Sequence, residues 1–185
     1  MSEPTLRDRF HLIGIGGAGM SVVAELLASR GATVEGSDRE DSAVLEHLRS
    51  VGVRVYVGHD ASHVDPTAVV VVSTAIRESN PELAIARERG QRVIHRSQAL
   101  ALAASGMRFV GVAGAHGKTS TSGMLAIALA ACGLDPSVAV GGVLPQLGTG
   151  AHLGAGDVFV AEADESDGSF LNYSPSIEIV TNVEP

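Results

Sequence analysis

Short apolar runs alternate with amphipathic stretches along the first hundred residues. Five runs have the length and composition of strands: residues 10–15, 32–37, 53–57, 68–73 and 92–95. Three stretches between them carry apolar residues at helical spacing: residues 19–29, 42–50 and 81–89. Strands that alternate with helices are typical of a parallel sheet covered on both faces. The pattern therefore predicts a doubly wound α/β unit.

The same alternation begins again after residue 106. Four more strands and one helix are expected there: strands at 108–113, 138–140, 157–163 and 177–181, and a helix at 118–131. The break between the two patterns predicts domains at 1–106 and 107–185. The glycine-rich stretch 141–156 is expected to be a long mobile loop. Because the second pattern stops just after a strand, we expect the chain to hold only the beginning of its second domain.

Composition and charge exclude several classes of protein. Of 185 residues, 13 are Lys or Arg and 21 are Asp or Glu, and the net charge of −8 has the wrong sign for a nucleic-acid or anionic-membrane surface. No apolar run approaches the roughly 18 residues of a membrane span, and the N-terminus is too acidic for a signal peptide. A single cysteine excludes an internal disulfide. We expect a cytoplasmic protein without nucleic-acid or membrane partners, and the sequence leaves its oligomeric state open.

The first glycine-rich turn has the pattern of a diphosphate site. Residues 14–19 read Gly-Ile-Gly-Gly-Ala-Gly and match G-x-G-x-x-G between a predicted strand and a predicted helix. Glycines allow close backbone approach, and the helix N-terminus offers N–H groups to an anion. Asp38 ends the next strand, where a carboxylate can accept hydrogen bonds from a ribose. A nicotinamide-dependent oxidoreductase or an NAD-sensing module would use the same features, and the turn alone leaves that alternative open.

The second glycine-rich turn predicts an ATP phosphate loop. Residues 111–120 read Gly-Val-Ala-Gly-Ala-His-Gly-Lys-Thr-Ser, a shorter loop than a Walker A motif, whose first glycine is replaced by Val112. Lys118 is the only lysine in the chain, and it could reach the β- and γ-phosphates. The Thr119 hydroxyl could bind Mg²⁺. A P-loop switch or regulatory ATPase would also contain such a loop.

Acidic residues follow the apolar run 158–161 within the strand expected at 157–163. Glu162 is the first of them, and Asp164, Glu165 and Asp167 come next. The carboxyl end of a strand parallel to the phosphate-loop strand is a common place for a ligand of Mg²⁺ or of the catalytic water. Glu162 is therefore the candidate metal ligand.

Three histidines in the first half are candidates of different kinds. His11 lies near the start of a strand and is expected to be structural, whereas His63 is expected at the surface. His59, within Gly58-His59-Asp60, is a candidate for the mouth of the first sheet.

Taken together and in this order, the motifs resemble those of the Mur ligases, and the resemblance covers essentially the whole chain. The segments that carry it are 14–21, 36–38, 72–76, 80–82, 114–120, 162–167 and 181–185. Within the family, the glycine-rich first loop resembles that of members that add L-alanine to UDP-N-acetylmuramate, rather than that of the ligase that recycles murein tripeptide.

The resemblance implies three domains: a Rossmann-like domain for the UDP-sugar, a central P-loop ATPase domain, and a C-terminal domain that helps to bind the amino acid. Residues 1–106 would form the first, and 107–185 the N-terminal part of the second. It also implies that ATP phosphorylates the muramoyl carboxylate of UDP-N-acetylmuramate and that the amine of L-alanine attacks the acyl phosphate, with Mg²⁺ as cofactor. Residues 1–185 alone are expected to lack this ligase activity.

Site residues follow from the resemblance by position. It implies an ATP site made of Gly114, Ala115, His116, Gly117, Lys118, Thr119, Ser120 and Asn182. It implies a UDP-sugar site made of Gly16, Gly17, Ala18, Gly19, Met20, Ser37, Asp38, Ser73 and Thr74. Lys118 and Glu162 would be catalytic, and Thr119 and Glu162 would hold Mg²⁺. The family usually has threonine at the position of Ala115, so a hydroxyl contact is lost there while backbone contacts to phosphate should remain.

Overall fold

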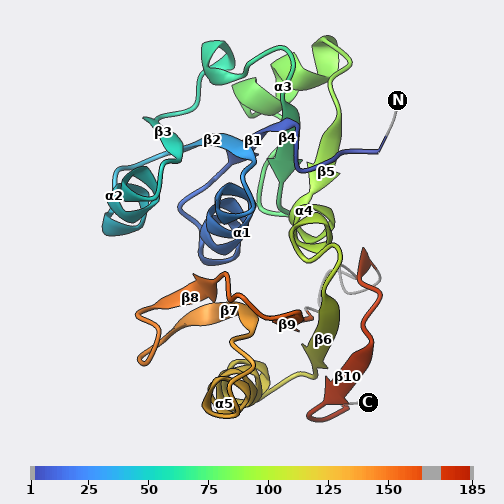
Figure 1. Cartoon of the computed structure of the whole chain (residues 1–185). Helices are drawn as coiled ribbons and strands as arrows, with labels where there is room; N and C mark the ends of the chain where they lie inside the picture. Colours follow the sequence, from blue (N-terminus) through green and yellow to red (C-terminus); the bar gives the residue numbers. More distant parts are fainter. Residues whose placement is uncertain (1–2, 164–171, 184–185) are drawn as a thin grey trace. The chain divides into compact units, whose positions relative to one another are not determined.

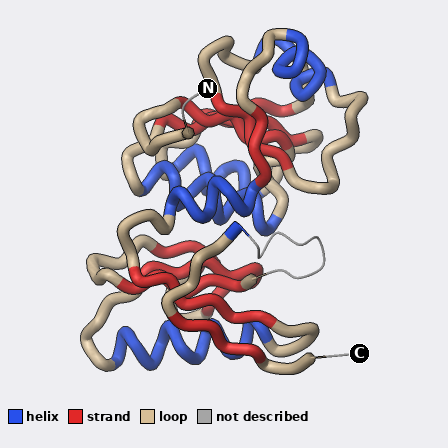
Figure 2. Tube along the Cα trace, turned by 90° about the vertical axis from the view of Figure 1, so that its right-hand side faces the viewer, coloured by secondary structure: helices blue, strands red, loops and turns tan. Residues whose placement is uncertain are grey.

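The computed structural model of the chain describes residues 3–163 and 172–183. The chain divides into two compact units, Met1–Ala103 (unit 1) and Ala104–Pro185 (unit 2). Each unit has its own five-stranded sheet (Figures 1 and 2).

Unit 1 is a doubly wound parallel sheet with strand order β3-β2-β1-β4-β5. Its strands are β1 (Arg9–Ile13), β2 (Thr33–Asp38), β3 (Arg54–Val57), β4 (Val69–Val72) and β5 (Val93–His95). Its helices are α1 (Ala18–Ser29), α2 (Ala43–Ser50), α3 (Pro81–Glu88) and α4 (Arg96–Ala103), with a 3₁₀ turn, η1, at Ala61–His63. The predicted α/β fold class is confirmed.

The two faces of this sheet are covered by different helices. Helices α1, α2 and α4 lie on one face, and α3 with η1 lies on the other (Figure 1). Side chains alternate along a strand, so Phe10 and Leu12 point to the face opposite that of His11 and Ile13. Ile13 packs with Leu83 of α3. The face toward α3 therefore combines apolar residues with buried polar ones.

Helix α4 was not expected from the sequence. It begins at Arg96, directly after β5 ends at His95, so no glycine, proline or turn residue separates strand from helix. By contrast, α1 and α3 are followed by Gly31 and Gly90, both in the left-handed conformation that ends a helix, and the sequence marks them correctly.

Unit 2 has the strand order β10-β6-β9-β7-β8, parallel except for the pair β7–β8. Its strands are β6 (Arg108–Ala113), β7 (Ser137–Leu144), β8 (Thr149–His152), β9 (Val158–Glu162) and β10 (Ile177–Val180). Helix α5 (Lys118–Ala131) packs on β6, β7 and β9. Within the described ranges, none of the helices is both long enough and apolar enough to cross a membrane.

The expectation of a long mobile loop at 141–156 is wrong. Strand β7 continues to Leu144, and β8 pairs with it in an antiparallel hairpin. A Cβ atom on Gly150 would lie 2.5 Å from the Val140 carbonyl oxygen and 2.6 Å from that of Gly142. Glycine is thus required here because two backbones approach closely, which is the opposite of a need for mobility.

Candidate functional site

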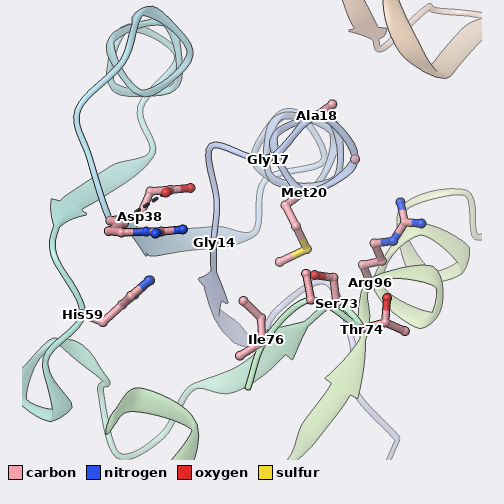
Figure 3. Close-up of a pocket in the computed structure, with 13 residues that line it drawn as sticks. Gly14, Gly17, Ala18, Met20, Asp38, His59, Ser73, Thr74, Ile76 and Arg96 are labelled. Atoms are coloured by element: carbon pink, nitrogen blue, oxygen red, sulfur yellow. Dashed lines mark hydrogen bonds between the residues drawn. The ribbon is translucent and has the colours of Figure 1, made fainter. Parts of the chain in front are cut away.

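A cavity of about 480 Å³ opens at the carboxyl ends of β1 and β4 in unit 1 (Figure 3). The chain leaves β1 toward β2 on one side and leaves β4 toward β5 on the other. The cavity therefore lies at the point where the strand order reverses, which is where doubly wound sheets bind ligands. The turn after β1 and residues 73–76 after β4 form its walls.

Most of the residues expected at the UDP-sugar site line this cavity. Those that do are Gly17, Ala18, Gly19, Met20, Asp38, Ser73 and Thr74. Gly16 and Ser37 are not among the lining residues. The side chain of Ser37 is fully buried beneath the cavity. The lining also includes residues that the sequence did not assign to it: Gly14, Arg39, Ala75, Ile76 and Arg96, with His59 at the expected mouth of the sheet.

The glycine turn leaves the N-terminus of α1 open. Asp38 holds the turn in place, since its Oδ2 accepts the Gly16 N–H at 2.8 Å and its Oδ1 accepts the Arg39 N–H at 2.7 Å. Gly17 is the N-cap of α1, and no side chain caps the helix. A Cβ on Gly19 would overlap the Arg96 guanidinium. The helix N-terminus and the Arg96 cation thus adjoin, and both favour an anion.

A buried polar cluster lies beneath the cavity, on the α3 face of the sheet. At its centre is Glu82, whose side chain is 0% exposed. Its Oε2 accepts a hydrogen bond from the Ser37 hydroxyl and lies 3.3 Å from His59 Nδ1. Its Oε1 lies 3.2 Å from Nδ1 of His63, which is stacked on Tyr56. His63, expected at the surface, is partly buried, with 21% of its side chain exposed, and belongs to this cluster.

His11 lies between two buried carboxylates in the same cluster. Its Nδ1 is 3.8 Å from Glu35 and its Nε2 is 3.5 Å from Glu82. Burial alone would lower the pKa of His11, but Glu35 and Glu82 outweigh this effect and raise it. Burial likewise favours a higher pKa for Glu82, but the contacts with His11 and Ser37 outweigh this effect and lower it. The cluster therefore favours a protonated His11 and an ionised Glu82.

This ion cluster makes the stability of unit 1 depend on pH. The stabilisation from His11 is fully present below its ordinary pKa of 6.5 and is lost as pH rises through the raised value. That from Glu82 is present above its ordinary pKa of 4.5 and is lost as pH falls through the lowered value. We expect that His11→Gln will not show this loss of unfolding free energy at high pH. The loss amounts to roughly 1.4 kcal/mol for each pH unit by which the pKa of His11 in the folded protein exceeds that in the unfolded chain.

Urea unfolding, followed by amide NMR signals of β1, checks this expectation. The difference in unfolding free energy between wild type and His11→Gln should shrink as pH rises above the ordinary histidine value. His47→Gln is the matched control, because His47 is an exposed histidine whose carboxylate partner, Glu25, lies 3.1 Å away. A difference that is constant with pH would contradict a titrating His11.

The phosphate loop in unit 2 joins β6 to α5. Gly117 is the N-cap of α5 and has the left-handed conformation, with φ of 82°. Helix α5 starts at Lys118, and the Lys118 ammonium donates to the Gly114 carbonyl oxygen at 2.7 Å. The lysine side chain therefore folds back over the loop. A cation and the N-terminus of a 14-residue helix meet here, as an anion site requires.

The end of β10 holds this loop from the side. The Thr181 hydroxyl donates to the His116 carbonyl oxygen at 2.6 Å. The Asn182 amide accepts the His116 N–H at 3.2 Å and donates to the His116 carbonyl at 3.1 Å. Asn182, expected near the nucleotide, thus positions the loop. Thr181 was part of a recognised motif but had no role assigned from sequence.

The two expected Mg²⁺ ligands lie beside consecutive residues of β7. Glu162 ends β9, and its Oε1 accepts the Gly141 N–H at 3.2 Å. A Cβ on Gly142 would lie 3.2 Å from the Thr119 methyl group. A carboxylate and a hydroxyl are the oxygen donors that Mg²⁺ prefers, with water or phosphate completing the shell. The residues present fit this ion.

Other acids expected near this site cannot be placed. Asp164, Glu165 and Asp167 lie outside the described residues. Among the residues that the structure describes, no group of three or more His, Cys, Asp or Glu side chains could hold a metal ion. Among the described residues, Glu162 and Thr119 are the candidate donors to a metal here.

Known proteins match the chain closely in sequence. UDP-N-acetylmuramate–L-alanine ligase of Renibacterium salmoninarum is 56% identical over 177 residues, which cover 96% of this chain and 38% of that protein. The enzyme of the same name from Streptomyces avermitilis is 56% identical over 182 residues, covering 98% of this chain and 39% of that protein. The chain thus spans about two fifths of the length of the curated relatives it matches.

Solved structures with two different ligase activities share the fold. The UDP-N-acetylmuramate–alanine ligase of Thermotoga maritima matches with a TM-score of 0.84 and 32% identity, covering 95% of this chain and 41% of that one. A UDP-N-acetylmuramate:L-alanyl-γ-D-glutamyl-meso-diaminopimelate ligase from Neisseria meningitides matches with a TM-score of 0.88 and 30% identity, covering 96% and 61%. The fold therefore does not separate these two activities.

A sequence model of the family identifies the chain directly. The model described as "Mur ligase family, catalytic domain" matches residues 9–108. That match covers more than half of the chain, and the relatives at 56% identity extend it over both units. The cavity after β1, the phosphate loop after β6 and these matches lead to one conclusion: this chain belongs to the Mur ligase family.

Proposed function

We propose that this chain supplies the nucleotide-sugar site and the ATP phosphate loop of a ligase that joins L-alanine to UDP-N-acetylmuramate. The observation that carries the proposal is the presence of two anion cradles, one in each unit, at the carboxyl ends of parallel strands. The 56% identity to ligases of that name favours L-alanine over the peptide substrate of the Neisseria enzyme. The site for L-alanine is not assigned to residues of this chain.

The proposed reaction has two steps. A carboxylate oxygen of the muramoyl group attacks the γ-phosphorus of ATP, and ADP leaves. The amine of L-alanine then attacks the acyl carbon, an amide forms, and phosphate and a proton are released. Phosphoryl transfer of this kind needs alignment and charge neutralisation more than a nucleophile from the protein.

Unit 2 would provide that alignment. The Lys118 ammonium would exchange the Gly114 carbonyl for β- and γ-phosphate oxygens, and the N–H groups of the first turn of α5 would bind the same phosphates. Loop residues 114–120 and Asn182 would surround them. Thr119 and Glu162 would hold Mg²⁺, which when bound neutralises phosphate charge.

Unit 1 would bind the UDP-sugar in the cavity after β1. Its diphosphate would lie at the N-terminus of α1, at residues 16–20, with the Arg96 cation beside it. Asp38 would accept from the ribose, because a carboxylate has lone pairs left after binding two backbone N–H groups. Ser73 and Thr74, which follow β4, line the same cavity. Since the Ser37 side chain is buried, we assign it no direct contact with the ligand.

Two other classes of protein account for only one unit each. A nicotinamide-dependent oxidoreductase or NAD-sensing module would use the cavity of unit 1 but not the loop around Lys118. A regulatory P-loop ATPase would use the loop but not the cavity. The ligase uses both, since it has two phosphate-bearing substrates.

Ligand-dependent thermal shifts test the proposal. UDP-N-acetylmuramate at about 100 times its dissociation constant should stabilise unit 1 by roughly 2.7 kcal/mol, which for a unit of this size is on the order of 10 °C. MgATP should stabilise unit 2 in the same way, whereas NAD(H) should stabilise neither. Stabilisation by NAD(H) and not by UDP-N-acetylmuramate would overturn the ligase in favour of the oxidoreductase.

A matched pair of variants ties the shift to the cavity. Ala18→Asp places a negative charge at the first position of α1, in the cavity wall. It should abolish the shift with UDP-N-acetylmuramate by repelling the diphosphate, while the unliganded protein keeps its stability because an acid suits a helix N-terminus. Ala43→Asp makes the same change at the first position of α2, away from the cavity, and should leave the shift intact.

A further inference from the structure

We propose that Glu82, acting through Ser37, fixes the tautomer of His59, so that His59 Nε2 offers a hydrogen-bond acceptor to the nucleoside of the ligand in the cavity. The inference rests on the proposed nucleotide-sugar function of unit 1. It makes His59 a binding residue and Glu82 a buried positioning residue.

The start of helix α3 fixes the position of Glu82 independently of the contacts that its side chain makes. The Asn80 side chain caps α3 by accepting the N–H groups of Glu82, at 2.9 Å, and of Leu83, at 3.3 Å. Pro81 occupies the first turn and fixes the backbone there. The Glu82 carboxylate is thus presented to the underside of the cavity from a fixed point, with no exposure to solvent.

The protons between Glu82 and His59 can be assigned from the contacts. An ionised Glu82 only accepts hydrogen bonds, and the lowered pKa of Glu82 agrees with that form. The single proton of the Ser37 hydroxyl is donated to Glu82 Oε2. The Ser37 oxygen, 2.8 Å from His59 Nδ1, must then act as the acceptor. His59 Nδ1 therefore carries a proton. The same nitrogen lies 3.3 Å from Glu82 Oε2.

This assignment decides what His59 can offer to a ligand. A neutral imidazole with a proton on Nδ1 has an acceptor lone pair on Nε2. His59 lies just after the end of β3. Its side chain lines the cavity and extends toward Asp38 and Gly14 (Figure 3). Its side chain is 24% exposed, so a ligand in the cavity can reach it.

An acceptor at this place suits one part of a nucleotide sugar. Phosphates accept hydrogen bonds, and the N–H groups of the glycine turn and the Arg96 cation serve them. The nucleoside, in contrast, offers donors: the ribose hydroxyls and, in uridine, the imide N–H of the base. Asp38 and His59 are acceptors on the same side of the cavity (Figure 3). We therefore assign His59 to a donor of the nucleoside.

The tautomer is measured by ¹⁵N NMR of the histidine side chains in the 185-residue chain, with His59 identified by its absence in His59→Gln. The wild type should show a protonated Nδ1 and an unprotonated Nε2. Ser37→Ala, which removes the acceptor without removing a charge, should shift His59 toward a mixture of tautomers, as should Glu82→Gln if it folds. A protonated Nε2 in the wild type, or an unchanged tautomer in Ser37→Ala, would overturn the proposal.

Affinity for UDP supplies the second readout. His59→Ala should weaken UDP about 5- to 10-fold, and His59→Gln should recover part of this because its amide oxygen can accept. His47→Ala, the control, removes an exposed histidine beside Glu25 and should change nothing. Tight UDP binding that is insensitive to His59→Ala would overturn this inference and leave the proposed function standing. Failure of the wild type to bind UDP would overturn both.

Analogues identify the donor. UDP lacking the 2′-hydroxyl, UDP lacking the 3′-hydroxyl and UDP methylated at N3 of the base are compared in the wild type and in His59→Ala. The analogue that loses affinity in the wild type but not in the variant has lost the group that donates to His59. If all three bind the wild type as well as UDP does, His59 accepts from none of these donors and the proposal falls.

Discussion

Replacing Lys118 with alanine is expected to weaken the binding of MgATP by roughly 10- to 100-fold, with little change in stability. A hydrogen-bonded charge of this kind contributes about 1.5–3 kcal/mol to binding, and no other lysine in the chain could replace it. In the unliganded protein the ammonium donates to the Gly114 carbonyl of its own loop, at the surface of unit 2 and outside its apolar core, so we expect the fold to stay in place without it. Isothermal titration with MgATP measures the change.

Arg108→Ala provides the control for charge. It removes one cation from unit 2 at the amino end of β6, whereas the phosphate loop follows the carboxyl end of the same strand. Arg108 forms an exposed pair with Asp157, at 3.0 Å, so little stability depends on it. MgATP should bind Arg108→Ala as it binds the wild type. Equal affinity in Lys118→Ala and the wild type would show that the lysine does not contact phosphate.

Replacing Gly114 with alanine is expected to destabilise unit 2 by about 2 to 4 kcal/mol and to disrupt the phosphate loop. Gly114 has φ of 125°, which a side chain disfavours, and a Cβ there would overlap the Thr181 hydroxyl. The same Cβ would lie 3.0 Å from the backbone nitrogen and oxygen of Asn182. Because the obstruction includes backbone atoms, the end of β10 has to move. Hydrogen exchange of the β6 amides, with urea unfolding, measures the loss.

Gly117→Ala is the matched comparison for that loss. Gly117 also has a positive φ, of 82°, but a Cβ there would meet no atom within 4 Å. Its cost should therefore be only the conformational one, about 1 to 2 kcal/mol. If the two alanine variants were equally stable, the close contact between Gly114 and the end of β10 would have no energetic role.

The sequence predicts the fold well because its signals are local. Apolar runs mark the strands, and left-handed glycines such as Gly31 and Gly90 mark helix ends. Helix α4 could not be predicted, because no turn residue before Arg96 marks the end of β5 and the start of a helix. The β7–β8 hairpin was not predicted because Gly150 resembles a flexible residue in sequence, although it serves a close contact between backbones.

The residues of the candidate sites likewise fall into those that local sequence patterns predict and those that only the fold brings together. The two glycine turns can be recognised because their residues are neighbours in the chain. The role of Arg96 depends on its placement over Gly19, far away in sequence, and that of Thr181 on hydrogen bonds to the phosphate loop. The link between His59 and Glu82 likewise exists only after β2, β3 and α3 have assembled. Single-sequence patterns contain no signal for such pairs.

The brace that Asn182 gives to His116 joins residues 66 positions apart. During synthesis, the phosphate loop leaves the ribosome long before Asn182 does. Until β10 has been made and has paired with β6, that segment lacks its native shape, and ATP has no preformed place to bind. The affinity of nascent chains of increasing length for ATP would thus report when β10 pairs with β6.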